Sequence, residues 1–333
     1  MNIRKLKSGN WNARVYLGMK DGKKQYYSVT AATKKRAELL ALQYQPTFSN
    51  NLTFLEASER YLNAKSNTLS PNTIRSYRIL LNRLTDLYKI PLIKLDNERV
   101  QLVINKLSYN LSPKSVKSTY GFITAVLSMF APDIKLTISL PEKIASETKI
   151  PTKEEVKLLI EEAASEEMSL AIQLAAFGSL RSGEICGLKS DCIYKDHIRI
   201  KRSLALNENG KYVIKKSPKT YAGFRDVPLP DEIIIKLKAL VKPDGSVFHY
   251  TPNSLNSAFR RLTKHCKMYP YKFHALRHYF ASFCHAKGIP DQYIMQIGGW
   301  DDVNTLTKIY QHTMDDEMEN TINKILSFYQ EME

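Results

Sequence analysis

Apolar and polar residues alternate along the first 30 residues of the chain. The stretches NARVYLG and KQYYSVT follow this two-residue period on either side of the turn Asp21-Gly22. Alternation around an Asp-Gly turn predicts antiparallel strands joined by a hairpin. A helical pattern follows from roughly Lys34 to Tyr44. We therefore predict a small three-stranded sheet with one helix over residues 1–48.

The apolar period changes to three or four residues after a polar stretch at 46–52, which predicts a linker followed by helices. Thr53 and Glu56 have capping-box spacing at the first helix. Two later helices begin with an N-cap serine before a proline, Ser70-Pro71 and Ser112-Pro113. Apolar residues recur at helical spacing behind them: Ile74, Tyr77, Leu81 and Leu84, then Val116, Tyr120, Ile123 and Leu127. A domain of four or five helices is predicted over residues 52–140.

A third domain is predicted over residues 150–333, after a second linker at 131–150 that contains two prolines. It begins with a capping box in PTKEE and an apolar helix, LAIQLAAFG. Strand-like pieces follow, HIRIKRSLAL, KYVIKKSPKT and FRDVPL, and then helices in EIIIKLKALV, LNSAFRRLTKHCK and the amphipathic DDEMENTINKILSFYQ. The whole pattern predicts a mainly α fold with small antiparallel sheets (α+β) in three domains.

Positive charge is concentrated in the first two predicted domains. Residues 1–51 carry ten Lys or Arg against two Asp or Glu, residues 52–145 carry thirteen against seven, and the remainder carries 26 against 24. This excess favours a polyanion, and double-stranded DNA in particular, over a merely solvated basic surface. The residues that we expect to contact DNA are Lys5, Arg14, Lys23, Lys24, Arg75, Arg78, Lys114 and Lys117. A basic accessory domain for another partner is the alternative for residues 1–48.

Several classes of protein are disfavoured. No apolar run approaches the ~20 residues of a membrane span, and the start MNIRKLKSGN lacks the apolar core of a signal peptide. The four cysteines form no CxxC motif, which favours free thiols in a reducing compartment. We therefore expect a cytoplasmic protein that does not bind membranes.

The clearest candidate chemistry lies near the end of the chain. On a helix, His274, Arg277 and His278 would project from one face, since they are spaced i, i+3 and i+4. A glycine pair and Trp300 follow, and Tyr310 comes ten residues later. An imidazole, a guanidinium and a tyrosine hydroxyl together suit attack on a phosphodiester.

Two simpler interpretations compete for this segment. Histidines at i and i+4 resemble a zinc pair, but no Glu lies between them, and no carboxylate or thiol at ligand spacing completes a site. A core helix with a buried histidine and an exposed arginine is the other interpretation. His274 alone would favour that core helix, whereas the combination of groups favours phosphodiester chemistry.

Five motifs follow one another along the chain: GSLRSGEICGL, KSPKT with FRDVPL, HALRH, GGW and TLTKIYQH. In their order and approximate spacing the chain resembles the tyrosine recombinase (phage integrase) family. Each is short, but the five in sequence are specific, and the resemblance covers the whole chain. It implies an N-terminal arm-type DNA-binding domain, a helical core-binding (SAM-like) domain and a C-terminal catalytic domain.

The resemblance also implies roles for single residues. Arg181 and Arg277 resemble the two catalytic arginines, and Glu184 resembles an orienting partner of Arg181, although it could simply pair with a nearby lysine. Two guanidiniums can clamp the charge that gathers on the non-bridging oxygens of a phosphodiester under attack. Lys219 matches the hairpin lysine that protonates the leaving 5′ oxygen; Lys215 and Lys216 lie near enough to leave this assignment open.

The nucleophile and its neighbours follow in the same way. Tyr310 resembles the nucleophile, and since a tyrosine hydroxyl titrates near ~10, it needs a positive surround and His274 as a base. Trp300 occupies a position where the family has histidine or tryptophan; it could donate its indole N–H to the phosphate or be plain core. His278 is outside the pattern and is expected to be structural. Such a site requires no metal and no cofactor.

The function implied is that of a site-specific DNA recombinase, an integrase of a phage or mobile element that works through a covalent 3′-phosphotyrosyl intermediate. Its partners would be core and arm attachment sites, three further protomers in a homo-tetramer, a DNA-bending host factor and an excisionase. A type IB-like topoisomerase and a catalytically silent DNA-binding protein of the same fold are the alternatives. Arg202, Arg225, Arg260 and Arg261 could contact phosphate, or lie on a solvated surface.

Overall fold

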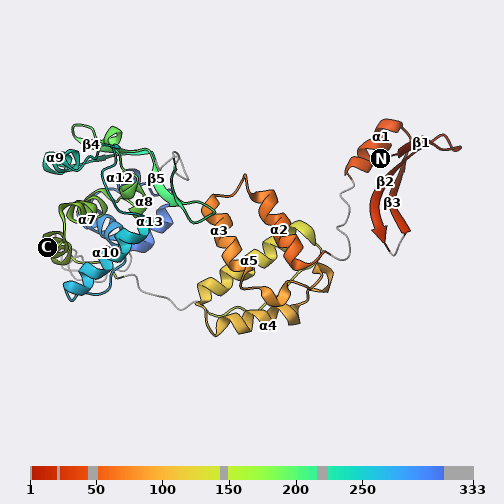
Figure 1. Cartoon of the computed structure of the whole chain (residues 1–333), viewed down its shortest axis with the longest axis horizontal. Helices are drawn as coiled ribbons and strands as arrows, with labels where there is room; N and C mark the ends of the chain where they lie inside the picture. Colours follow the sequence, from red (N-terminus) through yellow and green to blue (C-terminus); the bar gives the residue numbers. More distant parts are fainter. Residues whose placement is uncertain (1, 21–22, 44–51, 143–148, 216–223, 311–333) are drawn as a thin grey trace, which may run out of the picture. The chain divides into compact units, whose positions relative to one another are not determined.

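The computed structural model describes residues 2–20, 23–43, 52–142, 149–215 and 224–310 (Figure 1). The chain divides into two compact units, Met1–Ile144 and Ala145–Glu333. The fold is mainly helical with small antiparallel sheets, as the hydrophobic pattern predicts. The first unit holds two separate hydrophobic cores in its described part, and its predicted division near 46–52 stays a prediction. None of the helices in the described ranges is both long and apolar enough to span a bilayer.

The first unit begins with an antiparallel sheet in the order β1-β2-β3. The strands are β1 (Asn2–Lys5), β2 (Trp11–Lys20) and β3 (Lys23–Ala31), and helix α1 (Lys34–Gln43) packs against β2 and β3. Ala13 on the sheet meets Ala37 and Ala41 on the helix in a core that is closed to solvent. The small side chains let the helix approach the sheet closely. The turn Asp21-Gly22 lies outside the described residues.

Four α-helices and two 3₁₀ turns occupy the described residues from 52 to 142: α2 (Phe54–Lys65), α3 (Pro71–Leu81), η1 (Thr85–Leu87), η2 (Leu92–Lys94), α4 (Asn97–Ser108) and α5 (Pro113–Phe130). The predicted starts are confirmed: Thr53 and Glu56 form a reciprocal capping box. The hydroxyls of Ser70 and Ser112 accept from backbone N–H groups of the first turn, with proline as the first helical residue. Side chains such as Phe54 and Phe122 fill the core.

Two details of this region differ from the prediction. Helix α3 ends at Leu81, so Leu84 is buried by the turn into η1 and not by a continuing helix. Residues 131–140, which their proline had placed in a linker, run along the helical core instead. The Tyr120 hydroxyl donates to the Leu136 carbonyl at 3.1 Å, and the Gln101 side chain bonds the backbone of Ser139 at 3.0 and 2.8 Å.

The second unit is built around α7 (Glu166–Gly178), whose apolar run from Leu170 to Ala176 is almost wholly buried. Helix α11 (Ala275–Ala286) packs against it. The remaining helices of the described part are α6 (Lys153–Glu161), α8 (Ser182–Cys186), η3 (Ser190–Cys192), α9 (Asp231–Ala239), α10 (Pro252–His265), α12 (Asp291–Gly298) and α13 (Val303–Tyr310).

The strands of this unit form two antiparallel pairs in the described residues, where the sequence predicts one sheet. Strand β4 (His197–Ile200) pairs with β7 (Arg225–Pro228), and β5 (Ser203–Leu206) pairs with β6 (Tyr212–Lys215). The predicted strand HIRIKRSLAL is interrupted at Lys201 and Arg202, which separate β4 from β5. Strand β7 and helix α11 both lie beside α12, and this arrangement positions the candidate site.

Candidate active site

The candidate residues meet at the C-terminal end of α12. Gly299 ends this helix in the left-handed region (φ 68°, ψ 51°), which glycine adopts without strain. The last carbonyls of a helix lack helical partners and form the negative end of its dipole. Three successive carbonyls here each accept from a different arginine: Ile297 from Arg225, Gly298 from Arg277 and Gly299 from Arg181.

Arg181, the residue before α8, is held from two sides. Its Nη1 donates to Oε1 of Glu184 at 2.8 Å, while its backbone N–H donates to Oε2 of the same carboxylate at 2.9 Å. Its Nη2 donates to the carbonyl of Gly299 at 2.8 Å. The three-residue spacing in LRSGE permits this, since the third helical residue can reach back to the cap. The side chain is nevertheless 43% exposed, so a fixed guanidinium faces solvent.

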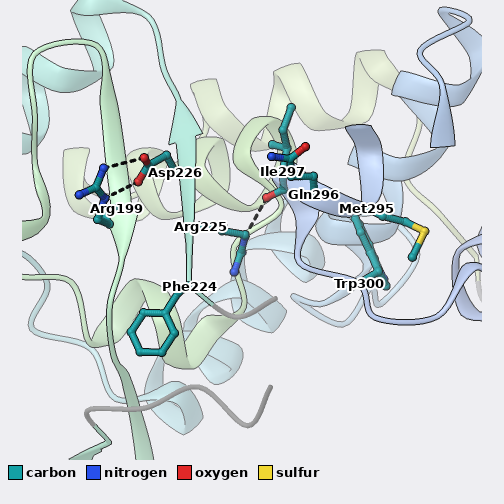
Figure 2. A pocket seen from close by; sticks show the side chains of 8 residues that line it. All are labelled: Arg199, Phe224, Arg225, Asp226, Met295, Gln296, Ile297 and Trp300. Carbon is teal, nitrogen blue, oxygen red and sulfur yellow. Dashed lines mark hydrogen bonds and ion pairs between the residues drawn. The ribbon is translucent and has the colours of Figure 1, made fainter. Parts of the chain in front are cut away.

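Glu184 is shared between two arginines. Its buried carboxylate also accepts from Nη1 and Nη2 of Arg225, at 3.2 and 2.8 Å. Nε of Arg225, which is itself buried, donates to the Ile297 carbonyl at 2.7 Å (Figure 2). Burial alone would raise the pKa of Glu184, but the hydrogen bonds and charges of Arg225 and Arg181 outweigh it and hold the pKa at about 2. The carboxylate is therefore ionised at neutral pH.

Arg277, on α11, is only 1% exposed. Its guanidinium donates to the carbonyls of Ser179 and Gly298, to the Ser179 hydroxyl at 3.2 Å and to the Gly299 carbonyl at 3.3 Å. Burial, and next the charge of Arg181, lower the pKa of Arg277. The ends of α7 and α12 thus hold this cation with their carbonyl dipoles. None of the acceptors bonded to it is a carboxylate, so no directly bonded counter-charge cancels its charge.

Trp300 covers Arg277. The guanidinium carbon lies 3.8 Å from the centroid of the indole ring, a cation–π contact. The ring is buried and stacks near Phe280, at a centroid distance of 6.5 Å. A side chain at position 298 would collide with it, since a Cβ on Gly298 would lie 1.8 Å from a ring atom. Trp300 therefore packs in a hydrophobic core and also contacts Arg277 of the candidate site.

Helix α13 packs into the same hydrophobic cluster through Leu306 and Ile309. Tyr310 is the last residue of this helix, and its side chain lies outside the described part of the chain. Lys219 and Lys216 fall in 216–223, also outside the described residues, while Lys215 ends β6. The roles of Tyr310 and Lys219 stay predictions.

His274 immediately precedes α11 and reaches solvent, and His278 lies one turn further on. Their rings meet edge to face, with centroids 4.8 Å apart. Desolvation lowers the pKa of His274 to about 4, with further contributions from His278 and Arg277. Burial and the charge of Arg277 lower the pKa of His278 to about 4 as well. Both imidazoles are thus neutral near pH 7.

The sequence interpretation missed Ser179 and left Arg225 open between a phosphate contact and a solvated surface. Arg225 is 7% exposed, so the solvated-surface alternative for it is wrong. The signal was present, because β7 alternates buried and exposed residues and Arg225 lies on the same face as Val227. Ser179 carried no comparable signal. Its role depends on a left-handed backbone (φ 58°) at the end of α7, which serine rarely adopts.

A cavity of ≈ 510 Å³ lies beside Arg225 (Figure 2). The last turn of α12 and Trp300 line one side of it, and Phe224, Arg225 and Asp226 line the other. Arg199 also lines it and forms a bidentate ion pair with Asp226, at 2.6 and 2.7 Å. The buried arginine therefore borders a space that small solutes can fill.

The predicted DNA-contact residues lie in the first unit. Lys5, Arg14, Lys114 and Lys117 are exposed, and Arg75 is half-buried. Arg78 pairs with Glu59 at 3.4 Å, and the Arg14 guanidinium lies 3.9 Å from the centroid of the Tyr26 ring. The side chains of Lys23 and Lys24 are outside the described part. Across the described ranges, no three His, Cys, Asp or Glu side chains gather as a possible metal site.

Ser179 offers a test of backbone strain at the site. We expect Ser179→Ala to lower the melting temperature more than Ser179→Gly. Both variants lose the hydroxyl that accepts from Arg277, but only glycine relieves the left-handed backbone, which is worth about 1 kcal/mol. Thermal unfolding of the two variants measures the difference. An alanine variant as stable as the glycine variant would contradict the strain.

A family model described as the phage integrase family matches residues 150–317. A tyrosine recombinase XerC-like protein of Caldanaerobacter subterraneus subsp. tengcongensis is 25% identical over 287 residues, 72% of this chain and 73% of that protein. The structure of the Tn1549 transposon integrase in complex with transposon right end DNA matches with a TM-score of 0.64 at 18% identity, over 79% of this chain and 98% of that one. A lambda integrase tetramer bound to a Holliday junction matches with a TM-score of 0.58 at 16% identity, over 91% and 98%.

Proposed function

Because the chain belongs to the phage integrase family, we propose that it integrates and excises a phage or other mobile element through a covalent 3′-phosphotyrosyl intermediate. It is a site-specific DNA recombinase of the tyrosine type. The basic residues 1–48 support the mobile-element role, since a second DNA-binding module allows the enzyme to bind arm sites as well as core sites.

The proposal rests on one observation: three arginines bond successive carbonyls at the end of α12, and two of them, Arg181 and Arg225, share the Glu184 carboxylate. Glu184 compensates one of the three charges, so the cluster of Arg181, Arg225 and Arg277 favours an anion beside it. Arg181 is the partly exposed member of the cluster, whereas Arg277 is buried and adds its positive charge without reaching solvent. In a site of low dielectric, such fixed charge stabilises a phosphate transition state far more than it would in water.

The proposed cleavage step gives each predicted residue one role. The Tyr310 hydroxyl attacks the phosphorus, the bond to the 5′ oxygen breaks, and the 3′ phosphate stays on the tyrosine. His274 takes the tyrosine proton, and Lys219 gives a proton to the departing 5′ oxygen. A 5′ hydroxyl of another strand reverses the step. The phosphotyrosine retains the bond energy, so rejoining requires no ATP.

The proposed partners are core and arm attachment sites on double-stranded DNA. We expect four copies of the chain to act together, a proposal supported by the structural similarity to a lambda integrase tetramer bound to a Holliday junction. A DNA-bending host factor and an excisionase would complete the assembly. We expect it to act in the cytoplasm, where bacterial DNA is found.

Covalent trapping tests the proposal. DNA flanking the gene supplies candidate sites, built as nicked duplexes that lose the released 5′ end. The expected result is an SDS-stable adduct that forms in EDTA, on the peptide that contains Tyr310. An adduct on another peptide would move the nucleophile. Tight binding without any adduct would favour a silent DNA-binding protein, and resealing of an intact duplex without partner exchange would favour a topoisomerase.

The rate of adduct formation is expected to stay level from about pH 8 to about pH 5 and to fall below that. The pKa of His274, lowered to about 4 chiefly by desolvation, keeps the ring a proton acceptor down to that value. Single-turnover rates against pH for the wild type and His274→Gln measure the effect. The acid limb is expected to vanish in the variant; a rate that already falls near pH 6.5 would contradict the assignment.

Stability changes in the same pH window and must be separated from chemistry. Unfolded histidines titrate near 6.5, whereas the pKa of folded His274 and of folded His278 is about 4. The unfolded state therefore binds more protons between these values, and stability falls as the pH drops from 6.5 to 4. Rates are accordingly normalised to the folded fraction, measured by thermal unfolding at each pH.

A further inference from the structure

Arg225, which is itself buried, bonds the carboxylate that holds Arg181 and the helix end whose next carbonyls hold Arg181 and Arg277. It bonds both oxygens of the Glu184 carboxylate, whose same two oxygens accept from Arg181. Its Nε bonds the Ile297 carbonyl, two residues before the Gly299 carbonyl that accepts from Arg181. A buried guanidinium with all these bonds satisfied is costly to move, because any shift leaves buried charges unpaired.

Arg225 also restrains the stretch of backbone that Arg277 bonds. The carbonyls of Ile297, Gly298 and Gly299 belong to one turn of backbone, so a hydrogen bond at the first of them restrains the other two. Arg277 donates to the second and third. Strand β7, which carries Arg225, thus connects the end of α12 to the start of α8.

We propose that Arg225 is a positioning residue for strand cleavage: it holds the Glu184 carboxylate and the last turn of α12 so that Arg181 and Arg277 stay aligned on the scissile phosphate. This inference rests on the proposed function. Arg225 does not touch DNA in this scheme, because its side chain is 3% exposed. A misplacement of a clamping group by about 1 Å can cost roughly 100-fold in rate.

The experiment compares Arg225→Gln with the wild type in adduct formation, on a duplex with which the wild type reacts. Cleavage is expected to slow roughly 100-fold at pH 7, while noncovalent binding of the same duplex is unchanged. Arg199→Gln is the matched control. This arginine lines the same cavity and is also ion-paired, but it bonds Asp226 on the surface, so its variant should cleave at the wild-type rate.

The pH profile separates positioning from loss of fold. The charged or titratable groups that act on Glu184 are Arg181, Arg225, Arg277 and His274. Without Arg225, burial raises the pKa of Glu184. The cleavage rate of Arg225→Gln should therefore show an additional fall with decreasing pH, at a higher pH than the fall set by His274. That additional fall should disappear in the Arg225→Gln, Glu184→Gln double variant. A merely structural role would leave the cleavage rate per folded molecule at the wild-type value at every pH.

Chemical rescue and a conservative variant complete the test. Arg225→Ala opens its site to the ≈ 510 Å³ cavity, so guanidinium ion at a non-denaturing concentration should restore part of its cleavage rate and leave the Arg199→Gln rate unchanged. Arg225→Lys keeps the charge and is expected to keep the wild-type pH profile yet remain slow, because one ammonium nitrogen cannot take the places of both Nε, which bonds Ile297, and the two Nη atoms, which bond Glu184.

Two outcomes would overturn the inference. The first is an Arg225→Gln variant that cleaves as fast as the wild type. The second is a loss of cleavage rate in this variant that equals its loss of folded fraction at every pH. If Arg225→Gln does not fold, Arg225→Lys is compared with the wild type instead. A wild-type cleavage rate for Arg225→Lys would show that positioning does not need the bond to Ile297, and would overturn the inference as well. A wild type that forms no adduct on any flanking duplex refutes the proposed function itself and this inference with it. The two failures are thus distinguishable.

Discussion

Tyr310→Phe is expected to abolish the covalent protein–DNA adduct and to leave noncovalent DNA binding intact. The substitution removes one hydroxyl, while Leu306 and Ile309 still anchor α13 in its hydrophobic cluster. Because no other group would supply the attacking oxygen, the cleavage rate should fall by at least about 10⁴-fold. Denaturing gels of nicked-duplex reactions measure the adduct, and gel shifts at matched salt measure binding.

Tyr293→Phe is the matched control for this experiment. Tyr293 lies on α12 in the same unit, is 50% exposed and loses the same hydroxyl, yet it has no part in the proposed chemistry. It should form the adduct at the wild-type rate. An adduct that persists in Tyr310→Phe would show that another residue is the nucleophile, and mass spectrometry of the modified peptide would identify it.

The sequence predicted the elements of this fold well where their signals are local. The capping box at Thr53 and the serine-proline starts at Ser70 and Ser112 satisfy N–H groups within one turn of themselves, so nothing distant can override them. The packed segment from 131 to 140 was misassigned for the opposite reason. This segment is held by contacts with the distant residues Gln101 and Tyr120. The alternation of Ile134, Leu136 and Ile138 indicates a buried face but not its partners.

The candidate site shows where such prediction ends. The residue types in LRSGE and HALRH suggested guanidiniums for a phosphate, but not what holds them. Arg181 bonds the carbonyl of Gly299 across 118 residues of sequence, and Arg277 bonds Ser179 across 98. Backbone carbonyls are available at every residue. Which of them are unpaired depends on where two helices end in space, and a side-chain pattern does not encode that.

This manner of holding the arginines has a functional consequence. Carboxylates around all three guanidiniums would neutralise the charge that the proposed phosphate contact requires. Helix ends orient a cation with partial charges only, so most of the positive charge remains available. Glu184 is the one full counter-charge bonded to the cluster in the described residues, and its two partners are Arg181 and Arg225.

Arg181→Gln is therefore expected to reduce the cleavage rate by about 10²- to 10³-fold with little change in melting temperature. The rate falls because Arg181 is the solvent-facing guanidinium of the cluster. Stability is nearly retained because Glu184 keeps both hydrogen bonds from Arg225, so no buried charge is left unpaired. Single-turnover adduct formation and thermal unfolding, measured on the same preparations, separate the two effects.

Arg181→Lys decides between charge and geometry as the basis of this effect. An ammonium restores the positive charge, but its single nitrogen cannot take the places of both Nη1, which bonds Glu184, and Nη2, which bonds the Gly299 carbonyl. We expect the lysine variant to recover only part of the lost rate. Full recovery would mean that charge alone suffices at this position, and the bonds to Glu184 and Gly299 would then serve the fold of the unit and not the alignment of the phosphate.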